Sequence, residues 1–274
     1  MESNPFIRQW HYDPQRPALA DYPASWDDRT TLDALDRNLE RIGEHHRRLW
    51  AHKRQAVLLV IHGVDASGKD SLIRTLARYA DPAGFHAWSF GRPHGAEARH
   101  DFLWRTTPHL PAFGEIAAFN RSYHEAVMAE RVWPVHAPEC YDWEARFAAI
   151  RAFEAHLESE GTRVLKLWLR VSPEKHRQRL LKRLDKPRKQ WKFDASDIEA
   201  WTRRHDYLHC VEQAIAATHT PQAPWLIIPD DQKSMARAIV ARLLADTLET
   251  LAPDYPPVDE AVLAKYRAML TESG

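Results

Sequence analysis

Residues 57–71, VLLVIHGVDASGKDS, constrain the fold of this chain more than any other segment. They open with five apolar residues in a row, which is typical of a strand covered on both faces. A loop bounded by Gly63 and Gly68 follows, and Lys69 then begins a segment with apolar residues at helical spacing. Backbone N–H groups at a helix N-terminus converge on an anion, and glycines let the backbone turn sharply and approach it. The order strand, loop, helix therefore predicts a phosphate-binding loop, to which Lys69 adds a positive charge.

Two acidic residues make this loop unusual. It matches G-x-x-x-x-G-K-[ST] up to the last position, where Asp70 replaces the hydroxyl residue that ordinarily holds magnesium. Inside the loop, Asp65 places a carboxylate where phosphate oxygens are expected, which is unfavourable unless a divalent cation bridges the two. We therefore interpret Asp65 as a metal ligand. The alternative is a turn aspartate that caps the backbone of the loop itself.

Length and composition set the broad class. With 274 residues, 44% hydrophobic and 28% charged, the chain can bury the core of one α/β domain with appendages. The 38 basic residues balance 38 acidic ones, so the overall charge indicates neither nucleic-acid nor membrane binding. Cys140 and Cys210 belong to no C-x-x-C pattern and are expected to be reduced thiols. Without an apolar signal core or a bilayer-spanning stretch, we expect a cytoplasmic protein.

The order of segments predicts one α/β domain with an arm and a tail. Residues 1–54 give an aromatic-anchored arm and an amphipathic helix over 31–53, with Thr30 and Asp33 as its cap. Residues 55–252 alternate strands and helices, which predicts a doubly wound, five-stranded parallel sheet with helices on both faces. Residues 253–274 form a tail with a short helix. The strands are expected at 57–61, 86–90, 115–119, 164–171 and 225–228, and core helices at 123–131, 141–159 and 234–251.

Polar residues directly follow the third expected strand. Asn120 and Arg121 come at its carboxyl end, and parallel strands present their carboxyl ends to the edge where ligands bind. We interpret Arg121 as a ligand contact, the alternative being an ion pair with a carboxylate at the sheet edge. Glu125 is a further candidate for the outer shell of a metal ion. Its alternative is a solvated helix residue.

Residues 172–219 are too long for a simple crossover and carry a concentrated positive charge. A run of charge is ordinarily a solvated helix face. Up to residue 192 the acidic partners expected at i, i+4 are mostly missing, since Glu174 and Asp185 alone offset the cations there, so we interpret the segment as binding a polyanion. The cations are Arg177, Arg179, Lys182, Arg183, Lys186, Arg188, Lys189 and Lys192.

Five segments together resemble the polyphosphate kinase 2 family, the polyphosphate-dependent nucleotide phosphotransferases. They occur in order over roughly residues 30–250, which is far more specific than a lone phosphate loop. The second motif begins with Asn120, as in the subgroup that is associated with both nucleoside mono- and diphosphates. The segments are GVDASGKD (63–70), HDFLWR (100–105), GEIAAFNRSYHE (114–125), RLLKRLDKPRKQWKF (179–193) and APWLIIPDDQK (223–233).

This resemblance implies a three-layer P-loop kinase fold with a helical lid at about residues 172–219. It implies reversible transfer of the terminal phosphoryl group of inorganic polyphosphate to a nucleoside mono- or diphosphate with Mg²⁺, or with Mn²⁺ in its place. The acceptor phosphate is already an anionic nucleophile, so no general base is needed. A homodimer or a homotetramer is also implied.

The resemblance also assigns roles to individual residues. Asp65 holds the metal ion and Lys69 grips the phosphates, while Asn120 orients a metal-bound water or a phosphate and Arg121 stabilises the transferring charge. Arg92, Asp101 and Arg105 contact the nucleotide. Polyphosphate contacts the loop and the lid, at Gly63, Ala66, Ser67, Gly68, Asp70, Ser71, Arg179, Arg183, Lys189 and Lys192.

The sequence departs from the family pattern in places, and two alternatives stay open. Where members commonly have a lysine and a small hydroxyl residue, this chain has Arg92 and His94 around Pro93. Ser71 replaces the usual glycine after the loop. One alternative is an NTP-dependent P-loop kinase of small molecules or nucleoside monophosphates. The other is a catalytically inactive polyphosphate- or nucleotide-binding regulator, which Asn120 and Asp70 favour.

Overall fold

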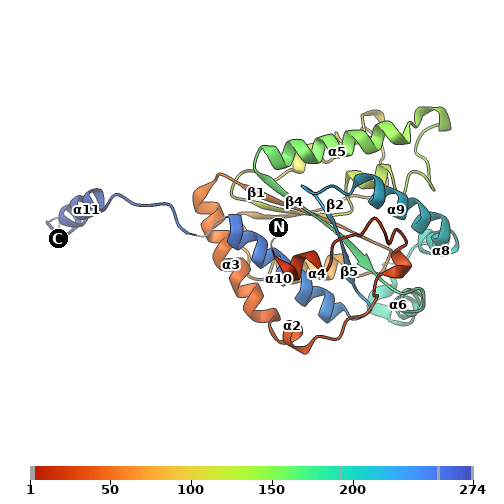
Figure 1. Cartoon of the computed structure of the whole chain (residues 1–274), viewed down its shortest axis with the longest axis horizontal. Coiled ribbons are helices and arrows are strands. Elements are labelled where there is room, and N and C mark those ends of the chain that lie inside the picture. The colour runs from red at the N-terminus through yellow and green to blue at the C-terminus, as the bar shows by residue number, and fades with distance from the viewer. Residues whose placement is uncertain (1–3, 192, 252–253, 273–274) are drawn as a thin grey trace.

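A five-stranded parallel sheet forms the centre of the computed structural model, which describes residues 4–191, 193–251 and 254–272 (Figure 1). The strand order is β2-β3-β1-β4-β5, so the strand before the phosphate loop lies in the middle. The predicted α/β class and the parallel sheet are confirmed. The strands are β1 Ala56–Gly63, β2 Phe85–Ser89, β3 Ile116–Asn120, β4 Thr162–Arg170 and β5 Trp225–Pro229.

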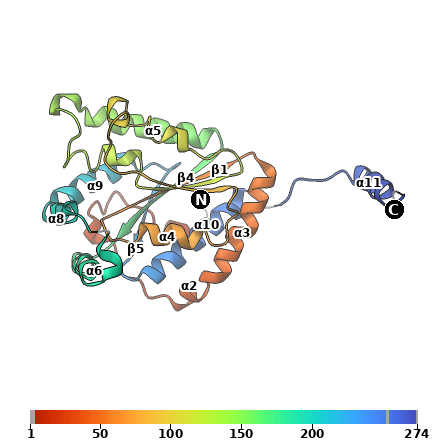
Figure 2. The same cartoon turned by 180° about the vertical axis from the view of Figure 1, so that it is seen from behind.

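Helices cover both faces of this sheet and give three layers (Figure 2). Side chains of β1 alternate between two cores: Val57, Leu59 and Ile61 pack with α3, α4 and α10, whereas Leu58 and Val60 pack with α5 and α9. Continuous burial of β1 explains why its sequence is apolar without alternation. The helices are α1 Pro5–Arg8, α2 Arg29–Asp33, α3 Leu35–His52, α4 Lys69–Leu76, α5 Trp143–Ser159, α6 Pro173–Asp185, α7 Pro187–Gln190, α8 Ala195–Thr202, α9 Arg204–Thr218, α10 Lys233–Leu251 and α11 Glu260–Glu272.

Two helix predictions were wrong in detail. The helix expected over residues 31–53 is two helices, α2 and α3, with a break at Ala34, where ψ is 1°. The cap of α2 is Asp28, whose carboxylate accepts the Thr31 N–H at 3.1 Å, and not the pair of residues 30 and 33. The helix expected over residues 123–131 is a single 3₁₀ turn, Tyr123–Ala126, because the backbone at Val127 leaves the helical region (φ −121°, ψ −1°).

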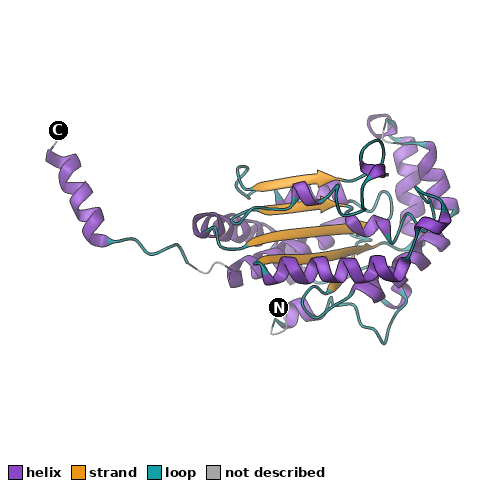
Figure 3. Cartoon of the chain, turned by 90° about the horizontal axis from the view of Figure 1, so that it is seen from above, coloured by secondary structure: helices purple, strands orange, loops and turns teal. Residues whose placement is uncertain are grey.

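The helices after β4 lie at the carboxyl end of the sheet. In Figure 3 all strands point towards one end of the molecule, the end at which α6 and α8 lie in Figure 1. Helix α9 returns from there and buries Val211, Ala214 and Ile215 in the core. Helix α11 lies away from this body, at the end of an extended segment (Figures 1 and 3). None of the helices in the described ranges is long and apolar enough to cross a membrane.

We expect Gly43→Ala to destabilise the fold, because α3 approaches the backbone after α4 at this glycine. A Cβ at Gly43 would lie 2.6 Å from the carbonyl oxygen of Tyr79, which cannot rotate away. The clash should cost about 1–3 kcal/mol of unfolding free energy, more than the ~1 kcal/mol that alanine gains over glycine in a helix. Denaturant unfolding measures the difference. Gly91→Ala is the control, since a Cβ at Gly91 meets nothing within 4 Å. Equal or greater stability of Gly43→Ala would contradict the packing.

Candidate active site

The phosphate loop connects β1 to α4 with the backbone geometry that the motif requires. Gly68 has φ 115° and caps α4, and a Cβ at this position would lie 3.1 Å from Lys233 Cε. Ala66, which has a side chain, also has a positive φ of 59°. The N–H groups of Ser71 and Leu72 bond back to the Gly68 carbonyl and close the first turn of α4. The N-terminus of α4 therefore points into the bend, as anion binding needs.

Lys69 lies under this bend. Its ammonium donates to the carbonyl oxygens of Gly63 at 2.7 Å and Val64 at 3.1 Å, so the side chain folds back along the loop. Burial, with the nearby charge of Arg121, lowers the pKa of Lys69 to about 8. A partly desolvated cation at this position gains free energy when an anion arrives.

Asp65 and Arg121 form an ion pair across the site. Arg121 Nη2 lies 2.7 Å from Asp65 Oδ1, and this contact joins the loop to the residue that follows β3. Burial alone would raise the pKa of Asp65, but the charges of Arg121 and Lys69 outweigh it and leave the pKa below its usual range. Arg121 has φ 64°, an uncommon conformation for a residue with a side chain, which persists where surrounding contacts fix it. The alternative reading of Arg121, an ion pair with a carboxylate, is thus observed. The partner carboxylate, however, belongs to the phosphate loop.

Asn120 and Asp70 form a second link between the same elements. Asn120 Nδ2 donates to Asp70 Oδ1 at 2.6 Å and fastens the end of β3 to the first turn of α4. Asp70, which replaces the usual hydroxyl residue, therefore accepts a hydrogen bond from within the protein. Ser71 Oγ donates to the Gly68 carbonyl at 2.8 Å, which holds this hydroxyl against the first turn of α4.

Only 12% of the Glu125 side chain is exposed, so the alternative of a solvated helix residue was wrong. Its Oε1 lies 3.1 Å from Nδ1 of His62 at the end of β1. Burial raises the pKa of Glu125, but the contact with His62 and the charge of Arg121 outweigh this and lower the pKa to about 2. The charge of a second ionised carboxylate thus acts on Arg121, although no ion pair joins the two in the described part of the chain. Sequence patterns could not find this cluster, because His62 reads as part of an apolar strand.

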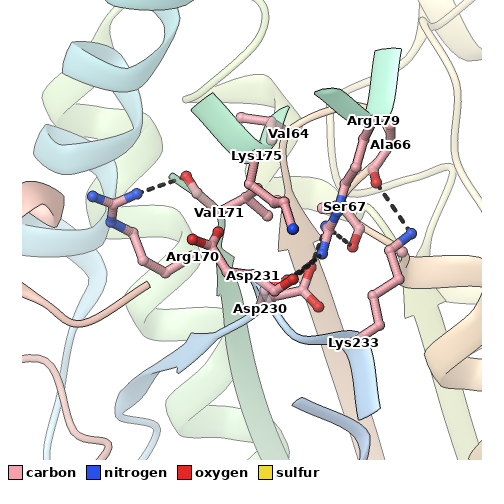
Figure 4. Close-up of polar contacts among 12 residues, drawn as sticks. Val64, Ala66, Ser67, Arg170, Val171, Lys175, Arg179, Asp230, Asp231 and Lys233 are labelled. Carbon is pink, nitrogen blue, oxygen red and sulfur yellow. Dashed lines mark hydrogen bonds and ion pairs between the residues drawn. The ribbon is translucent and has the colours of Figure 1, made fainter. Parts of the chain in front are cut away.

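The first lid helix and the end of β5 are fastened to the loop. Arg179 of α6 donates to the Ser67 carbonyl at 2.7 Å and to Asp230 Oδ2 at 2.9 Å, and Lys233 reaches the Ala66 carbonyl at 3.4 Å (Figure 4). Burial raises the pKa of Asp230 to about 6, and burial with the charge of Arg179 lowers the pKa of Lys233 to about 8. Asp230 and Lys233 were not predicted as site residues, although their position after the last strand was a signal for them.

A cavity of about 790 Å³ lies above the loop and is strongly basic. Among the described residues, its lining has nine cations and three carboxylates, Asp65, Asp70 and Asp231. Arg183, predicted in the lid, lines it while its guanidinium also contacts Asp197 of α8 at 2.8 Å. Lys192 lies outside the described residues. The cations are Lys69, Arg74, Arg121, Lys175, Arg179, Lys182, Arg183, Lys189 and Lys233.

A second cavity of about 300 Å³ shares Asp65, Gly91 and Arg121 with the first. It has a different character, because its described lining has five carboxylates against three arginines, together with two large aromatic side chains. The Asp65–Arg121 pair therefore stands where the two spaces meet. The acidic and aromatic residues that line the second cavity are Asp65, Glu125, Glu130, Asp197, Glu199, Trp133 and Tyr207.

The three residues predicted to contact a nucleotide lie in different surroundings. Arg92 lines the second cavity and donates to the Pro134 carbonyl at 2.9 Å. Arg105 is buried and bonds to Glu97 at 3.1 Å and to the Gly91 carbonyl at 2.7 Å, so it fixes the loop after β2. Asp101 accepts the N–H of Leu103 and stabilises a turn. Neither Arg105 nor Asp101 is among the described residues that line the two cavities.

A central phosphate loop, this strand order and basic helices over the loop define a P-loop kinase fold. Residues 26–255 match the family model described as Polyphosphate kinase 2 (PPK2), and the chain belongs to this family. It is 39% identical over 237 residues to an ADP-polyphosphate phosphotransferase of Rhodopseudomonas palustris, covering 83% of this chain and 82% of the relative. It is 39% identical over 233 residues to an AMP/ADP-polyphosphate phosphotransferase of Meiothermus ruber, covering 84% of each. The crystal structure of polyphosphate kinase 2 from Arthrobacter aurescens superposes with a TM-score of 0.83 at 32% identity, covering 95% of this chain and 91% of that one.

We expect the affinity for tripolyphosphate to fall above about pH 8. Lys69 and Lys233 have pKa values of about 8, so both are mostly charged at pH 7 and lose their protons towards pH 9. In Lys233→Arg one of the two cations stays charged throughout. The affinity of the wild type relative to this variant should fall by up to about tenfold between pH 7 and pH 9. Calorimetric titration without divalent cations measures both, and titration of the ligand itself cancels in the ratio. A constant ratio would contradict the assignment.

Proposed function

We propose that the protein is a polyphosphate-dependent nucleotide kinase. It transfers the terminal phosphoryl group of inorganic polyphosphate to nucleoside mono- or diphosphates with Mg²⁺, and the reaction is reversible. The observation that carries this proposal is the basic cavity over the loop, in which nine described cations face three carboxylates. Such an excess of cations suits a donor with a regular row of negative charges. Membership of the PPK2 family supports the same reaction.

The two cavities suggest a division between donor and acceptor. Polyphosphate lies in the basic cavity, along the loop backbone and under Arg179, Arg183 and Lys189, with Lys192 as a further lid contact. The acceptor nucleotide enters the second cavity, near Arg92, with Asp101 and Arg105 supporting the loop around it. Its terminal phosphate then meets the donor at the shared wall of Asp65 and Arg121. Approach from two cavities allows the attacking and leaving oxygens to lie in line.

The chemistry needs alignment and charge neutralisation. An oxygen of the acceptor phosphate forms a bond to the terminal phosphorus of the donor, and the bridging P–O bond to the shortened polyphosphate breaks. The attacking phosphate is anionic, so no base removes a proton. Lys69 and Arg121 stabilise the negative charge that moves between the two phosphates. Asn120 holds the end of β3 in register with the loop through Asp70.

Asp65 is the residue best suited to hold Mg²⁺. Its pKa lies below the usual range, so it is ionised, and it borders both cavities. The described residues contain no cluster of three or more metal-binding side chains. Mg²⁺ in phosphate-transfer sites is commonly held by one or two carboxylates together with phosphates and water, so Asp65 suffices, with Glu125 in the outer shell. Mn²⁺ accepts the same oxygen ligands. When bound, the metal ion neutralises phosphate charge.

We also propose the remaining organisation that the resemblance implied. The chain has an arm and an amphipathic helix at residues 1–54 and a P-loop kinase core at 55–252. The core includes the lid at about residues 172–219, and a tail follows at 253–274. The protein acts in the cytoplasm as a homodimer or a homotetramer.

We expect polyphosphate, and not ATP, to serve as donor for ADP or AMP. The full chain with Mg²⁺ and either acceptor is offered each donor separately, and product nucleotides are separated by chromatography. Lys69→Ala should lower kcat by about 10²-fold or more, because a cation placed for the transition state is removed. Turnover with ATP alone would support an NTP-dependent kinase. Tight polyphosphate binding without turnover in the wild type would support a regulator.

Removal of one lid charge should separate donor from acceptor binding. Lys189 lines the basic cavity, whereas its neighbour Arg188 on the same short helix α7 is not among the described lining residues. Lys189→Ala should raise the KM for polyphosphate by roughly 3–10-fold, and less at high salt, because part of a screened attraction is lost. The KM for ADP should stay unchanged, and Arg188→Ala should leave both constants near those of the wild type. Equal effects on donor and acceptor would count against the division.

A further inference from the structure

His62 is a buried polar residue at a core position of the central strand. It precedes Gly63 at the end of β1, its relative exposure is 0%, and it faces the same side of the sheet as Leu58 and Val60. A buried imidazole is unfavourable unless both ring nitrogens find partners. The contacts of the two ring nitrogens therefore indicate the role of His62.

Both ring nitrogens of His62 face the segment that follows β3. Nε2 lies 2.9 Å from Ser122 Oγ, and Nδ1 lies 3.1 Å from Glu125 Oε1. Neither Nδ1 nor this carboxylate oxygen has a well-aligned hydrogen-bond partner in the described part of the chain, so their 3.1 Å contact is a close polar contact that is not ideally aligned. An ionised carboxylate only accepts, so the ring proton belongs on Nδ1, and Nε2 accepts the hydroxyl proton of Ser122. Burial lowers the pKa of His62, which keeps the ring neutral and this single tautomer in place.

Glu125 in turn acts on Arg121. The charge of Glu125 is the largest of the influences that raise the pKa of Arg121, ahead of Asp65. Glu125 and Asp65 both line the second cavity together with Arg121. Arg121 thus contacts the Asp65 carboxylate directly at 2.7 Å, whereas Glu125, which forms no ion pair with it in the described part of the chain, acts on it through its charge from the wall of the same cavity. Of these two carboxylates, only Glu125 contacts His62.

We propose that His62 is a positioning residue that fixes Glu125 as the permanent counter-ion of Arg121. Asp65 is then able to exchange Arg121 for a metal ion without leaving the partly buried guanidinium uncompensated. This inference rests on the proposed function, in which Asp65 takes Mg²⁺ and Arg121 faces the transferring phosphoryl group. Without His62 the Glu125 carboxylate loses its fixed orientation, and Arg121 depends on Asp65 alone, in competition with the metal.

His124 provides a matched control in the same part of the core. It is equally buried, and its ring centroid lies 5.9 Å from that of His62. Its Nε2, however, contacts Glu154 Oε1 at 2.9 Å, and Glu154 is bonded to Lys166 at 2.6 Å. This cluster does not include Glu125 or Arg121. Replacement of His124 therefore disturbs the core to a similar degree while the counter-ion of Arg121 stays in place.

The kinetic test compares His62→Ala, His62→Gln and His124→Ala with the wild type in the polyphosphate and ADP assay. His62→Ala should lower kcat by about 10–100-fold, as is typical when a residue that orients an active-site side chain is removed. It should also raise the Mg²⁺ concentration that gives half-maximal rate, with KM for both substrates little changed. His62→Gln should restore most of kcat, because its amide donates to Glu125 and accepts from Ser122. His124→Ala should lower the melting temperature similarly but keep kcat within about twofold, because its imidazole packs edge-on against His62 but bonds to Glu154 and not to Glu125.

Several outcomes would overturn the proposal. An unchanged kcat or Mg²⁺ requirement in His62→Ala would do so, and so would equal loss of kcat in His62→Ala and His124→Ala. The double variant His62→Ala with Glu125→Gln should be no slower than Glu125→Gln alone, because both act through one carboxylate. Additive losses would mean that His62 acts independently of Glu125.

A spectroscopic readout separates this proposal from the proposed function. In ¹⁵N spectra of histidine-labelled wild type, the His62 signal, assigned by its absence in His62→Gln, should show the Nδ1–H tautomer. Glu125→Ala should shift that signal, since the partner of Nδ1 is lost. The Nε2–H tautomer, or no shift in Glu125→Ala, would overturn the positioning role. Absence of turnover in the wild type would instead count against the proposed function, and the tautomer still decides the role of His62.

Discussion

The ion pair between Asp65 and Arg121 is the contact on which the site depends. Asp65 belongs to the loop after β1, and Arg121 follows β3, so the pair exists because the strand order places β3 beside β1. The backbone hydrogen bonds between β1 and β3 extend as far as Arg121, because the Arg121 N–H bonds to the Ile61 carbonyl at 3.0 Å. Backbone pairing therefore sets the distance between the two charges. Two cavities meet at this pair, and the chemistry of each is decided by what surrounds it.

Charge is separated within a protein that has no net charge. The basic cavity collects cations from the loop, α6, α7 and the start of α10, while the second cavity collects carboxylates from the segment after β3 and from α8. The α6 cations are held in place by acidic partners, Arg179 by Asp230 and Arg183 by Asp197. These pairs order long side chains that would otherwise be mobile, so less entropy is lost when a polyanion binds. The acidic wall also disfavours entry of polyphosphate into the space proposed for the nucleotide.

The sequence predicted those features that depend on local geometry. The loop, its glycine at Gly68 and the apolar strand before it follow from backbone rules over a dozen residues, and Arg121 follows from the rule for parallel strand ends. The sequence did not reveal partners that come together only in the fold. Glu125 was placed in an expected helix, which the structure replaces with a 3₁₀ turn in contact with His62, and Lys233 was included only as the last residue of a family-like segment, without a role. Periodicity reports burial, but it does not report which polar groups meet inside the core.

The depressed pKa values of Lys69 and Lys233 connect the stability of the site to its ligand. Burial and neighbouring cations lower both to about 8, so the protein holds charges where they are less favourable than in water. A phosphate chain in the basic cavity, as proposed above, would supply the negative charge that offsets this cost, and the free energy released would contribute to binding. A site satisfied entirely by its own carboxylates would be more stable alone but would bind a polyanion more weakly. The imbalance of charge above the loop is therefore a property that binding uses, and the carboxylates near it lie where they fasten the lid or compensate Arg121.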